Sequence, residues 1–476
     1  AFGHQCAVIM PAFRSIYRAG VEIETTDVSF AIPMSDQKLV GGRLLKSKLP
    51  DSDVPVWLID QPQYFDRESL YGDAGGDYRD NAERFTFFCR AALAALARSG
   101  MKVDVLHCND WQSGLIPALI NASPDRYPGL SDAATLMTIH NMAYQGQFNA
   151  EAFRWTGLDW NHFHHDSFEF YGQLNFLKAG IASADHVTTV SPRYAMEIQT
   201  PQHGCGLEGV IGAKGGRVTG ITNGIDQTIW NPSTDVKIPA RYGRDDWYEG
   251  KAANKKSLQA EFGLEVSEEV PMIGLVGRLA DQKGWDLILP LIWRHVQEKR
   301  PTQWMILGSG DYRIENELHE LTSRAPLQVA AHIGFHDALA HRIEAGSDLF
   351  VMPSHYEPCG LNQLYSLRYG TVPIVTATGG LADTVVDTTP ETLANGTATG
   401  FHLGAGTVDA LDEAIGRALY LRYHEKKNWD NLVGRAMTAD WSWRKSASQY
   451  VELYESAVSL KRSAHSGHSD REAGES

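Results

Sequence analysis

The chain has 476 residues, of which 43 are Lys or Arg and 58 are Asp or Glu, so its formal net charge is −15 with neutral histidines. Hydrophobic residues make up 43 % and charged residues 21 % of the chain, which is ordinary for globular domains and excludes global disorder. The negative charge argues against nucleic acid as a partner, because a polyanion needs a cationic surface, but it leaves a neutral polysaccharide open.

Membrane and metal signals are absent from the sequence. No apolar run reaches the roughly 18 residues of a membrane-spanning helix, and the N-terminus lacks the basic-then-apolar pattern of a signal peptide. The five cysteines contain no Cys-x-x-Cys pair, which predicts neither a disulfide framework nor a zinc site. We therefore expect a cytoplasmic protein without membrane contact, metal or other cofactor.

Short β-branched, apolar runs recur along the chain, and each is followed by a longer segment of helical period. In the first half these runs are 103–109, 134–141, 186–191 and 217–224. In the second half they are 272–279, 304–310, 348–354 and 372–380. Continuous apolar strands that alternate with helices predict an α/β fold with parallel sheets covered on both faces.

The series of strands is interrupted once. Residues 226–256 are rich in Pro, Asn, Asp, Trp and Tyr and contain no strand pattern. The interruption predicts two doubly wound, Rossmann-like domains that cover residues 1–225 and 226–440. The segment 461–476 has no apolar residue beyond Ala, and we expect it to be a disordered tail.

Polar residues follow the predicted strands of the first domain at the edge where open α/β sheets bind ligands. Asp110 comes after the first run, His140 and Asn141 end the second, and Asn223 lies at the end of the fourth. Taken alone, His140 would more often be a structural histidine, and Asp110 would also serve as a helix N-cap. Their common position instead favours a ligand site in a cleft between the two domains.

In the second domain, Arg278 and Lys283 directly follow a buried strand. An Arg and a nearby Lys at a strand end can neutralise a diphosphate, although a solvated charged loop would contain the same residues. Gly379 and Gly380 also follow a strand and open a helix, where backbone N–H groups can approach an anion. A tight turn is the alternative interpretation of that glycine pair.

The stretch from Glu357 to Leu361 reads EPCGL. Pro358 suits the first turn of a helix, which would leave the amides of Cys359, Gly360 and Leu361 as free donors. Glu357 would then hold a carboxylate at an anion-binding turn, or only complement the helix dipole for about 0.3–1 kcal/mol. The same turn could lower the thiol pKa of Cys359, but no positioned base makes it a nucleophile.

These stretches together resemble bacterial glycogen synthases and plant starch synthases, the family-five glycosyltransferases. The matching segments read HCNDWQSGLIPALI, TIHNMAYQGQF, GQLNFLKAGI, GITNGIDQTIWNP, VGRLADQKGWDLI, LGSGD, HIGF, PSHYEPCGLNQL, YGTVPIV and TGGLADTV. The resemblance implies a GT-B fold of two facing Rossmann-like domains with the active site in the interdomain cleft. It also implies that residues 441–460 form a helix that crosses back to the first domain.

The implied reaction transfers glucose from ADP-glucose to the non-reducing end of an α-1,4-glucan with retention of configuration. By family position, Arg278 and Lys283 neutralise the leaving diphosphate, and Glu357 is the carboxylate usually called catalytic. The residues that match positions around the glucosyl unit are Tyr78, Asp110, His140, Asn141 and Asn223. The positions expected to hold the diphosphate through backbone amides are Cys359, Gly360, Leu361, Gly379 and Gly380.

The family also has an N-terminal strand and a Lys-x-Gly-Gly-Leu loop that contacts the donor, and this chain begins after the matching position. This departure predicts a fragment and makes a glucan-binding remnant without turnover one alternative. A second alternative is another nucleotide-sugar glucosyltransferase of the same fold, such as a sucrose or small-acceptor glucosyltransferase. A related phosphorylase would need a pyridoxal-phosphate lysine.

Among retaining mechanisms we favour front-face transfer over a double displacement with two carboxylates.

Overall fold

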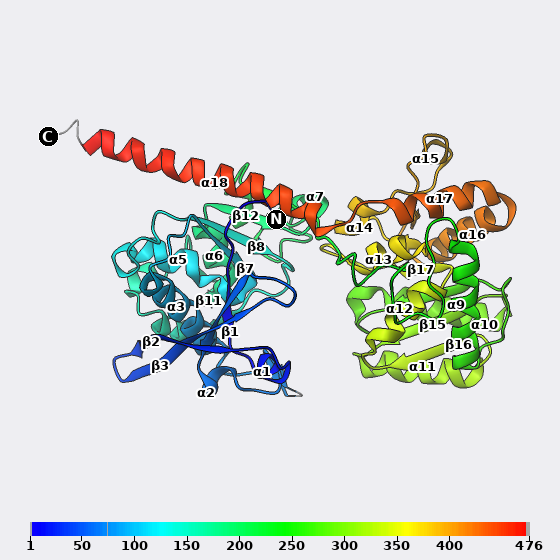
Figure 1. Cartoon of the computed structure of the whole chain (residues 1–476), viewed down its shortest axis with the longest axis horizontal. Coiled ribbons are helices and arrows are strands. Elements are labelled where there is room, and N and C mark those ends of the chain that lie inside the picture. The colour runs from blue at the N-terminus through cyan, green and yellow to red at the C-terminus, as the bar shows by residue number, and fades with distance from the viewer. Residues whose placement is uncertain (1, 74, 473–476) are drawn as a thin grey trace. The chain divides into compact units, whose positions relative to one another are not determined.

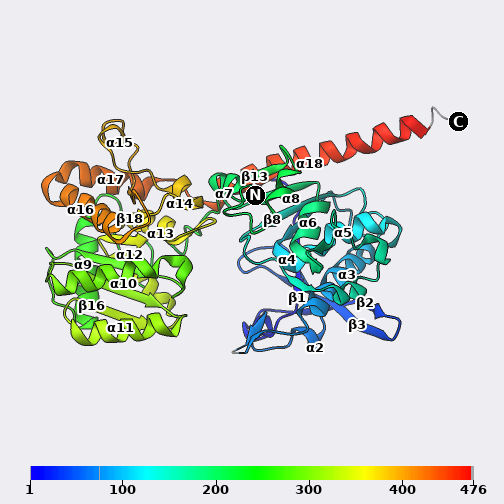
Figure 2. The same ribbon diagram turned by 180° about the vertical axis from the view of Figure 1, so that it is seen from behind.

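The computed structural model describes residues 2–73 and 75–472, with side chains as far as residue 463. The chain forms two compact units (Figures 1 and 2). Unit 1 comprises Ala1–Thr189, Ala195–Thr219 and Ser448–Ser476, and unit 2 comprises Val190–Tyr194 and Gly220–Ala447. The sequence placed the domain boundary at residues 225 and 226. None of the helices among the described residues is both long enough and apolar enough to cross a membrane.

Unit 1 contains two four-stranded sheets and two small ones. The first has the order β1-β4-β3-β2 and contains β1 (Val8–Pro11), β2 (Glu24–Ser35), β3 (Lys38–Lys48) and β4 (Pro55–Asp60). The second has the order β13-β12-β8-β7 and contains β7 (Val105–Asn109), β8 (Ala134–Ile139), β12 (His186–Thr189) and β13 (Val218–Gly220). The small sheets pair β9 (Gln147–Asn149), β10 (Glu169–Phe170) and β11 (Gln173–Asn175), and separately β5 (Gly72–Asp73) and β6 (Gly76–Asp77).

The helices of unit 1 cover these sheets and connect the parallel strands. They are α1 (Arg14–Arg18), α2 (Pro62–Phe65), α3 (Asn81–Ser99), α4 (Asp110–Ser113), α5 (Leu115–Ala122), α6 (Phe176–Ser183) and α8 (Glu208–Gly212). The helix α7 (Pro192–Glu197) begins within the short segment assigned to unit 2. Buried aromatic and aliphatic residues of α3 and α5 supply much of the core, because both helices are apolar over most of their length.

Unit 2 is built on one six-stranded sheet with the order β16-β15-β14-β17-β18-β19. Its strands are β14 (Met272–Val276), β15 (Gln303–Gly308), β16 (Val329–Ile333), β17 (Leu349–Met352), β18 (Val372–Val375) and β19 (Phe401–His402). Each neighbouring pair is parallel. The helices are α9 (Trp247–Phe262), α10 (Trp285–Gln297), α11 (Tyr312–Arg324), α12 (Asp337–Gly346), α13 (Asn362–Tyr369), α14 (Gly379–Thr384), α15 (Pro390–Ala394), α16 (Val408–His424) and α17 (Lys426–Thr438).

The sheet of unit 2 is buried on both faces, as the continuous apolar runs predicted. Alternate residues of a strand enter different hydrophobic clusters, so Trp304 and Ile306 pack with α10, α11 and α16. Met305 and Leu307 pack on the other face with residues of α9 and α12. This division follows from the period of two in a β-strand and confirms the predicted α/β architecture.

Every run predicted as a strand overlaps an observed strand, although the observed strands are shorter. The sequence did not predict β2 and β3, which form an antiparallel hairpin in unit 1. In β2 the buried residues alternate with exposed ones, as expected for a sheet with one solvated face. Such a strand lacks the continuous apolar run that marks the other strands.

The C-terminal helix α18 (Trp443–Glu472) is longer than the sequence indicated. Disorder was predicted from residue 461, but the structure continues the helix through residue 472; residues 473–476 lie outside the described part. Lys461 lies 3.2 Å from Asp185, and Arg462 lies 3.2 Å from Asp104, so both cations contact unit 1. Ion pairs can hold a segment that has few apolar residues, which the composition alone does not reveal.

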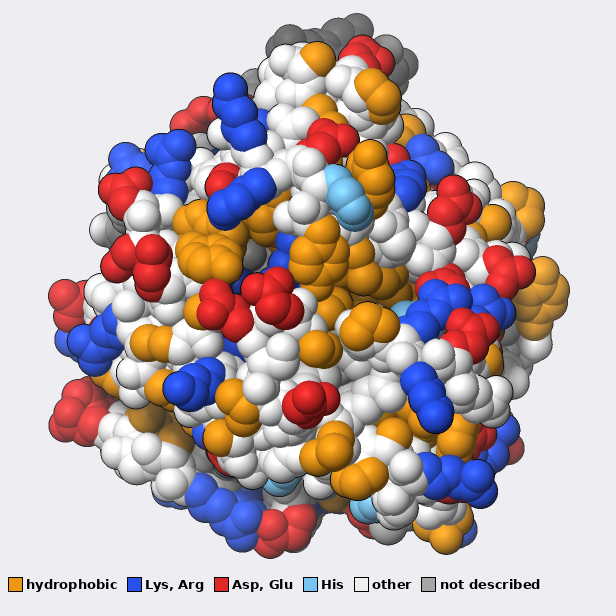
Figure 3. All heavy atoms as spheres, turned by 90° about the vertical axis from the view of Figure 1, so that its right-hand side faces the viewer, with side chains coloured by type: hydrophobic (Ala, Val, Ile, Leu, Met, Phe, Trp, Pro, Cys, Tyr) orange, Lys and Arg blue, Asp and Glu red, His pale blue; other side chains and the backbone are white. Residues whose placement is uncertain are grey.

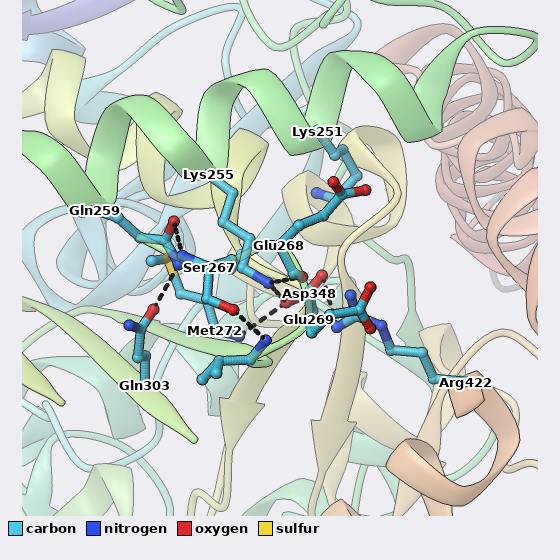
Figure 4. A network of polar contacts seen from close by, with 12 residues as sticks. Lys251, Lys255, Gln259, Ser267, Glu268, Glu269, Met272, Gln303, Asp348 and Arg422 are labelled. Atoms are coloured by element: carbon cyan, nitrogen blue, oxygen red, sulfur yellow. Dashed lines mark hydrogen bonds and ion pairs between the residues drawn. The ribbon is translucent and has the colours of Figure 1, made fainter. Parts of the chain in front are cut away.

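A buried polar network fastens α9 to the sheet of unit 2 (Figure 4). Asp348 accepts hydrogen bonds from Lys255 Nζ at 2.9 Å and from the backbone N–H of Met272 at 2.8 Å. Its other carboxylate oxygen lies 2.8 Å from Nη1 of Arg422 on α16. Three elements distant in sequence therefore share one carboxylate.

Candidate functional site

In unit 1, two predicted site residues meet at the carboxyl ends of β7 and β8. These strands are parallel neighbours with Asn109 opposite Thr138, so the residues that follow them lie side by side. The backbone N–H of His140 donates to Oδ1 of Asp110 at 2.8 Å. Nε2 of His140 lies 2.9 Å from Oδ1 of Asn109. His140 thus has structural contacts on both its backbone and its ring.

Asp110 has an unusual backbone conformation and environment. Its φ is +53°, in the left-handed region that residues other than glycine rarely adopt. Burial raises the pKa of its carboxyl group, while the charge of His140 and backbone hydrogen bonds from His140 and Asn141 act in the opposite direction. Asp110 is the first residue of α4, and Asn109 is the N-cap. Strained residues of this kind cluster at functional sites.

Tyr78 and Tyr71 lie on the segment that leads into α3. The ring of Tyr78 contacts two guanidinium groups, with that of Arg67 at 4.7 Å and that of Arg84 at 5.1 Å from its centroid. Tyr71 was not predicted, yet burial and the charge of Asp110 raise the pKa of its hydroxyl. Its ring lies 6.3 Å from that of Trp111, which follows Asp110. No strand-end pattern marks Tyr71 in the sequence, because it belongs to a loop.

In unit 2, the predicted Lys283 and Glu357 form an ion pair. Nζ of Lys283 lies 2.5 Å from Oε2 of Glu357, and Ser354 Oγ donates to the same oxygen at 3.1 Å. Their loops follow β14 and β17, which are adjacent strands of the sheet. The Glu357 side chain is nearly buried, with an exposure of 8 %, whereas the Lys283 side chain is 25 % exposed. The structure therefore provides a cation, a carboxylate and a hydroxyl at one point on the strand edge.

Gln282 connects the predicted Arg278 to the Glu357 loop and was missed by sequence reasoning. Its Oε1 accepts a hydrogen bond from Nη2 of Arg278 at 2.9 Å. Its Nε2 donates to the carbonyl of Tyr356 at 3.1 Å, and its own carbonyl accepts from the N–H of His355 at 2.9 Å. Gln282 lies inside the same GRLADQKG stretch that identified Arg278 and Lys283, but nothing in that pattern indicated an amide cross-link.

The predicted helix start at Pro358 is wrong. The helix α13 begins at Asn362 with Leu361 as its N-cap, so Pro358 lies in the preceding loop. Gly360 has a φ of +70°, a left-handed conformation that interrupts a right-handed helix. The amides of Cys359 and Gly360 therefore belong to an irregular loop and not to a helix N-terminus.

Cys359 differs from the expectation of a lowered thiol pKa. Burial raises its pKa to about 12, although a hydrogen bond with the backbone of Asn223 acts in the opposite direction. The thiol is therefore protonated at neutral pH and is not an activated nucleophile. The same contact brings Asn223 next to the EPCGL loop, so these two predicted site residues are neighbours within unit 2.

Gly379 and Gly380 pack directly on the backbone of this loop. A Cβ atom on Gly379 would lie 2.0 Å from the carbonyl oxygen of Glu357, and one on Gly380 would lie 2.1 Å from that of Cys359. The N–H of Gly380 already donates to the carbonyls of Glu357 and Pro358, at 3.0 and 3.1 Å. In this structure the glycine pair thus serves close packing, and the Gly380 amide is engaged inside the loop.

One exposed ring stands at the carboxyl end of β16. Phe335 is 92 % exposed and follows Gly334, whose φ is +139°. A large apolar ring displayed beside a ligand-binding edge suits the flat face of a nucleobase. The HIGF stretch that contains Phe335 entered the family resemblance, but its role was not predicted.

Two cavities of unit 2 lie elsewhere. A cavity of about 370 Å³ is lined at the amino ends of β14 and β15 by residues that include His295, Arg300, Asp412 and Tyr423. Its charged groups already pair with one another, since Nη1 of Arg300 lies 2.7 Å from Asp412. Figure 3 faces the side with α10 and α16, where hydrophobic side chains gather around a hollow. No group of three or more His, Cys, Asp or Glu among the described residues is arranged to bind a metal ion.

Comparisons with known proteins show the family of the chain. Residues 1–213 match the family described as starch synthase catalytic domain, and residues 259–431 match glycosyl transferases group 1. The chain is 61 % identical to a glycogen synthase of Rhodopirellula baltica over 98 % of this chain and 94 % of the relative. A glycogen synthase of Syntrophotalea carbinolica is 46 % identical, with 96 % and 93 % covered.

Two solved structures have the same fold. The catalytic domain of starch synthase IV from Arabidopsis thaliana, bound to ADP and acarbose, has a TM-score of 0.85 and 33 % identity over 96 % of this chain and 93 % of that one. A sucrose-phosphate synthase from Thermosynechococcus elongatus has a TM-score of 0.52 and 20 % identity, with 87 % of each chain covered, and shows the fold alone. Both comparisons support the predicted two-domain α/β architecture.

Proposed function

Because this chain belongs to the bacterial glycogen synthase family of glycosyltransferases, we propose that it transfers glucose from ADP-glucose to the non-reducing end of an α-1,4-glucan with retention of configuration. The observation that carries the proposal is the Lys283–Glu357 pair beside Arg278, at the carboxyl edge of β14 and β17. The ADP in the starch synthase IV structure supports an adenine nucleotide as the donor. The identity to glycogen synthases favours this function over another nucleotide-sugar transferase of the same fold.

The donor diphosphate is assigned to unit 2. Arg278 and Lys283 neutralise the charge that develops on the phosphate oxygen as the bond to glucose breaks, which is the electrostatic contribution to catalysis. Lys283 is held by Glu357 before the donor arrives, so its ammonium group is already oriented. The loop of Cys359, Gly360 and Leu361 and the glycine pair shape the same edge, and Phe335 provides a face for the base.

The glucosyl unit is assigned to Asp110, His140, Asn141, Tyr78 and Asn223. The raised pKa of Asp110 and its fixed position suit hydrogen bonding to sugar hydroxyls. In the reaction, the bond between C1 and the phosphate oxygen breaks, ADP leaves, and O4 of the acceptor attacks the same face of C1. The departing phosphate oxygen takes the acceptor proton, and Glu357 stabilises the positive charge that develops on the sugar.

The experiment that tests this proposal measures ADP release from ADP-glucose with glycogen present, beside UDP-glucose under the same conditions. We expect glycogen-dependent ADP release and slower turnover of UDP-glucose. The Glu357→Gln variant should lower the turnover by about two to three orders of magnitude, as the loss of a charge-stabilising group does elsewhere. Absence of turnover with either donor, from protein that unfolds in a cooperative transition, would overturn the proposal.

A further inference from the structure

A two-residue hairpin turn in unit 1 carries a tyrosine that the turn does not favour. Tyr171 and Gly172 connect β10 to β11, and Phe170 is paired with Gln173 on either side of them. Their φ values are +49° and +77°, as in a type I′ turn, where both central residues are left-handed. Asn-Gly is the preferred sequence for this turn, whereas a bulky aromatic residue at positive φ is an outlier.

Packing does not account for this tyrosine either. Its side chain is 86 % exposed, so little of the ring is removed from water. The ring meets Phe170 edge-on, with centroids 4.7 Å apart and an angle of 74° between the planes. One face of an aromatic ring is thus presented to solvent by a backbone that tolerates it poorly, and such outliers motivate a functional explanation.

The hairpin that presents the ring is firmly held from behind. Nζ of the buried Lys178 donates to the carbonyls of His165 and Glu169, and it lies 5.7 Å from the centroid of the Phe170 ring. The Glu169 carboxylate accepts the N–H of Gly172 at 2.6 Å. These contacts fix β10 and the turn, so the backbone that carries the displayed ring is held in place.

The hairpin belongs to the small sheet that packs beside the strand end proposed to bind the glucosyl unit. Its sheet packs on Trp111, which follows Asp110, because the Trp111 ring lies 5.7 Å from that of Phe148 on β9 and 6.1 Å from that of Phe176. Tyr171 lies four residues before Asn175, the end of β11, a span of about 13 Å in extended chain. The labels β11 and α6 in Figure 1 mark this region. The displayed ring therefore belongs to the small sheet that packs beside the β7 strand end carrying Asp110.

We propose that Tyr171 is a stacking platform for an outlying glucosyl unit of the α-1,4-glucan acceptor, an inference that rests on the proposed function. The C–H faces of a pyranose are apolar and pack flat on an aromatic ring, while the sugar hydroxyls stay in water. The platform binds the polymer at a distance from the bond being made. It therefore contributes to the affinity for long glucans and leaves the chemical step unchanged.

The test exploits the conformation of the turn. Tyr171→Asn removes the ring and places a residue that type I′ turns prefer, so the variant should unfold at the same temperature as the parent chain or higher. We expect its Kd for maltoheptaose and its KM for glycogen to rise about three- to tenfold, the range of one aromatic contact. The kcat and the KM for ADP-glucose should not change. Tyr171→Phe keeps the ring and should bind within about twofold of the parent.

A second exposed ring provides the matched control. Tyr420 on α16 is 57 % exposed and stacks on His424, so Tyr420→Ala removes a comparable ring from unit 2 and should leave glucan binding unchanged. If the parent enzyme is active and Tyr171→Asn binds maltoheptaose with unaltered affinity, the stacking platform is overturned and the proposed function stands. A parent chain that neither binds maltoheptaose nor releases ADP would overturn both this inference and the proposed function.

Discussion

The structure predicts that loss of Asp348 destabilises unit 2, because its buried carboxylate joins three elements (Figure 4). Replacing Asp348 by Asn removes the negative charge between Lys255 and Arg422. The NH2 group of the Asn side chain then faces one of these two cations and cannot accept a hydrogen bond from it. Breaking one side of a buried ion pair costs about 3–5 kcal/mol. Lys255 Nζ keeps a hydrogen bond to the carbonyl of Glu268 at 2.9 Å, so we expect the lower end, about 3 kcal/mol.

The measurement is thermal and urea unfolding of the full chain, followed by tryptophan fluorescence. At about 2–4 °C per kcal/mol for a unit of this size, Asp348→Asn should lower the corresponding transition by about 6–12 °C. Asp430→Asn is the control, because Asp430 pairs with Lys426 on the surface of α17 at 3.1 Å and should cost less than about 0.5 kcal/mol.

The pH dependence gives a second criterion. Burial opposes ionisation of Asp348, but the charges of Arg422 and Lys255 prevail and hold its pKa below the ordinary value. Between the folded pKa and the unfolded value of about 3.9 the unfolded chain binds more protons, so this stability is present above about pH 4 and is lost as the pH falls through the folded pKa. The difference in the free energy of unfolding between the parent chain and Asp348→Asn should therefore become smaller in acid. A difference no larger than that of the control, or one that grows as the pH falls, would refute the reasoning.

Three further predictions concern the carboxyl edge of β14 and β17, which is proposed to bind the donor diphosphate. Lys283→Ala should raise the KM for ADP-glucose about tenfold or more, because a cation that meets the diphosphate is lost; unchanged initial-rate kinetics would remove its assigned role. Gln282→Ala should lower kcat about tenfold without a large shift in the unfolding midpoint, since it frees the Arg278 guanidinium from its cross-link. Equal kcat values would show that this cross-link is dispensable. Gly380→Ala should cost about 1–3 kcal/mol and reduce turnover, because its methyl group would overlap the loop carbonyl; Gly416→Ala, in open space on α16, should be neutral or stabilising in the same urea titration.

Adjacency of strand ends could be predicted from the sequence. Asp110 follows one run and His140 lies at the end of another, and these two runs form parallel neighbours. Lys283 and Glu357 follow two other runs that are also adjacent in the sheet. In an open α/β sheet the carboxyl ends of neighbouring parallel strands meet at one edge, so the pattern of runs was sufficient to group these residues.

Loop conformation could not be predicted in the same way. The position of α13 depends on the left-handed Gly360, and the pKa of Cys359 depends on burial by residues distant in sequence. The engagement of the Gly380 amide by the Glu357 carbonyl is likewise a tertiary contact. These features arise from packing between loops, which leaves no periodic signal in the chain.

The return of α18 to unit 1 has a consequence for the order of assembly during translation. Residues 220–447 of unit 2 form one continuous stretch, so they can fold before α18 has emerged from the ribosome. Unit 1 lacks that helix until unit 2 has been synthesised, although residues 2–189 and 195–219 of unit 1 emerge before it. The hydrogen bond of 2.7 Å between His107 and Tyr454 therefore joins a part of the nascent chain that precedes unit 2 to a part that follows it. Completion of unit 1 has to wait for the synthesis of unit 2.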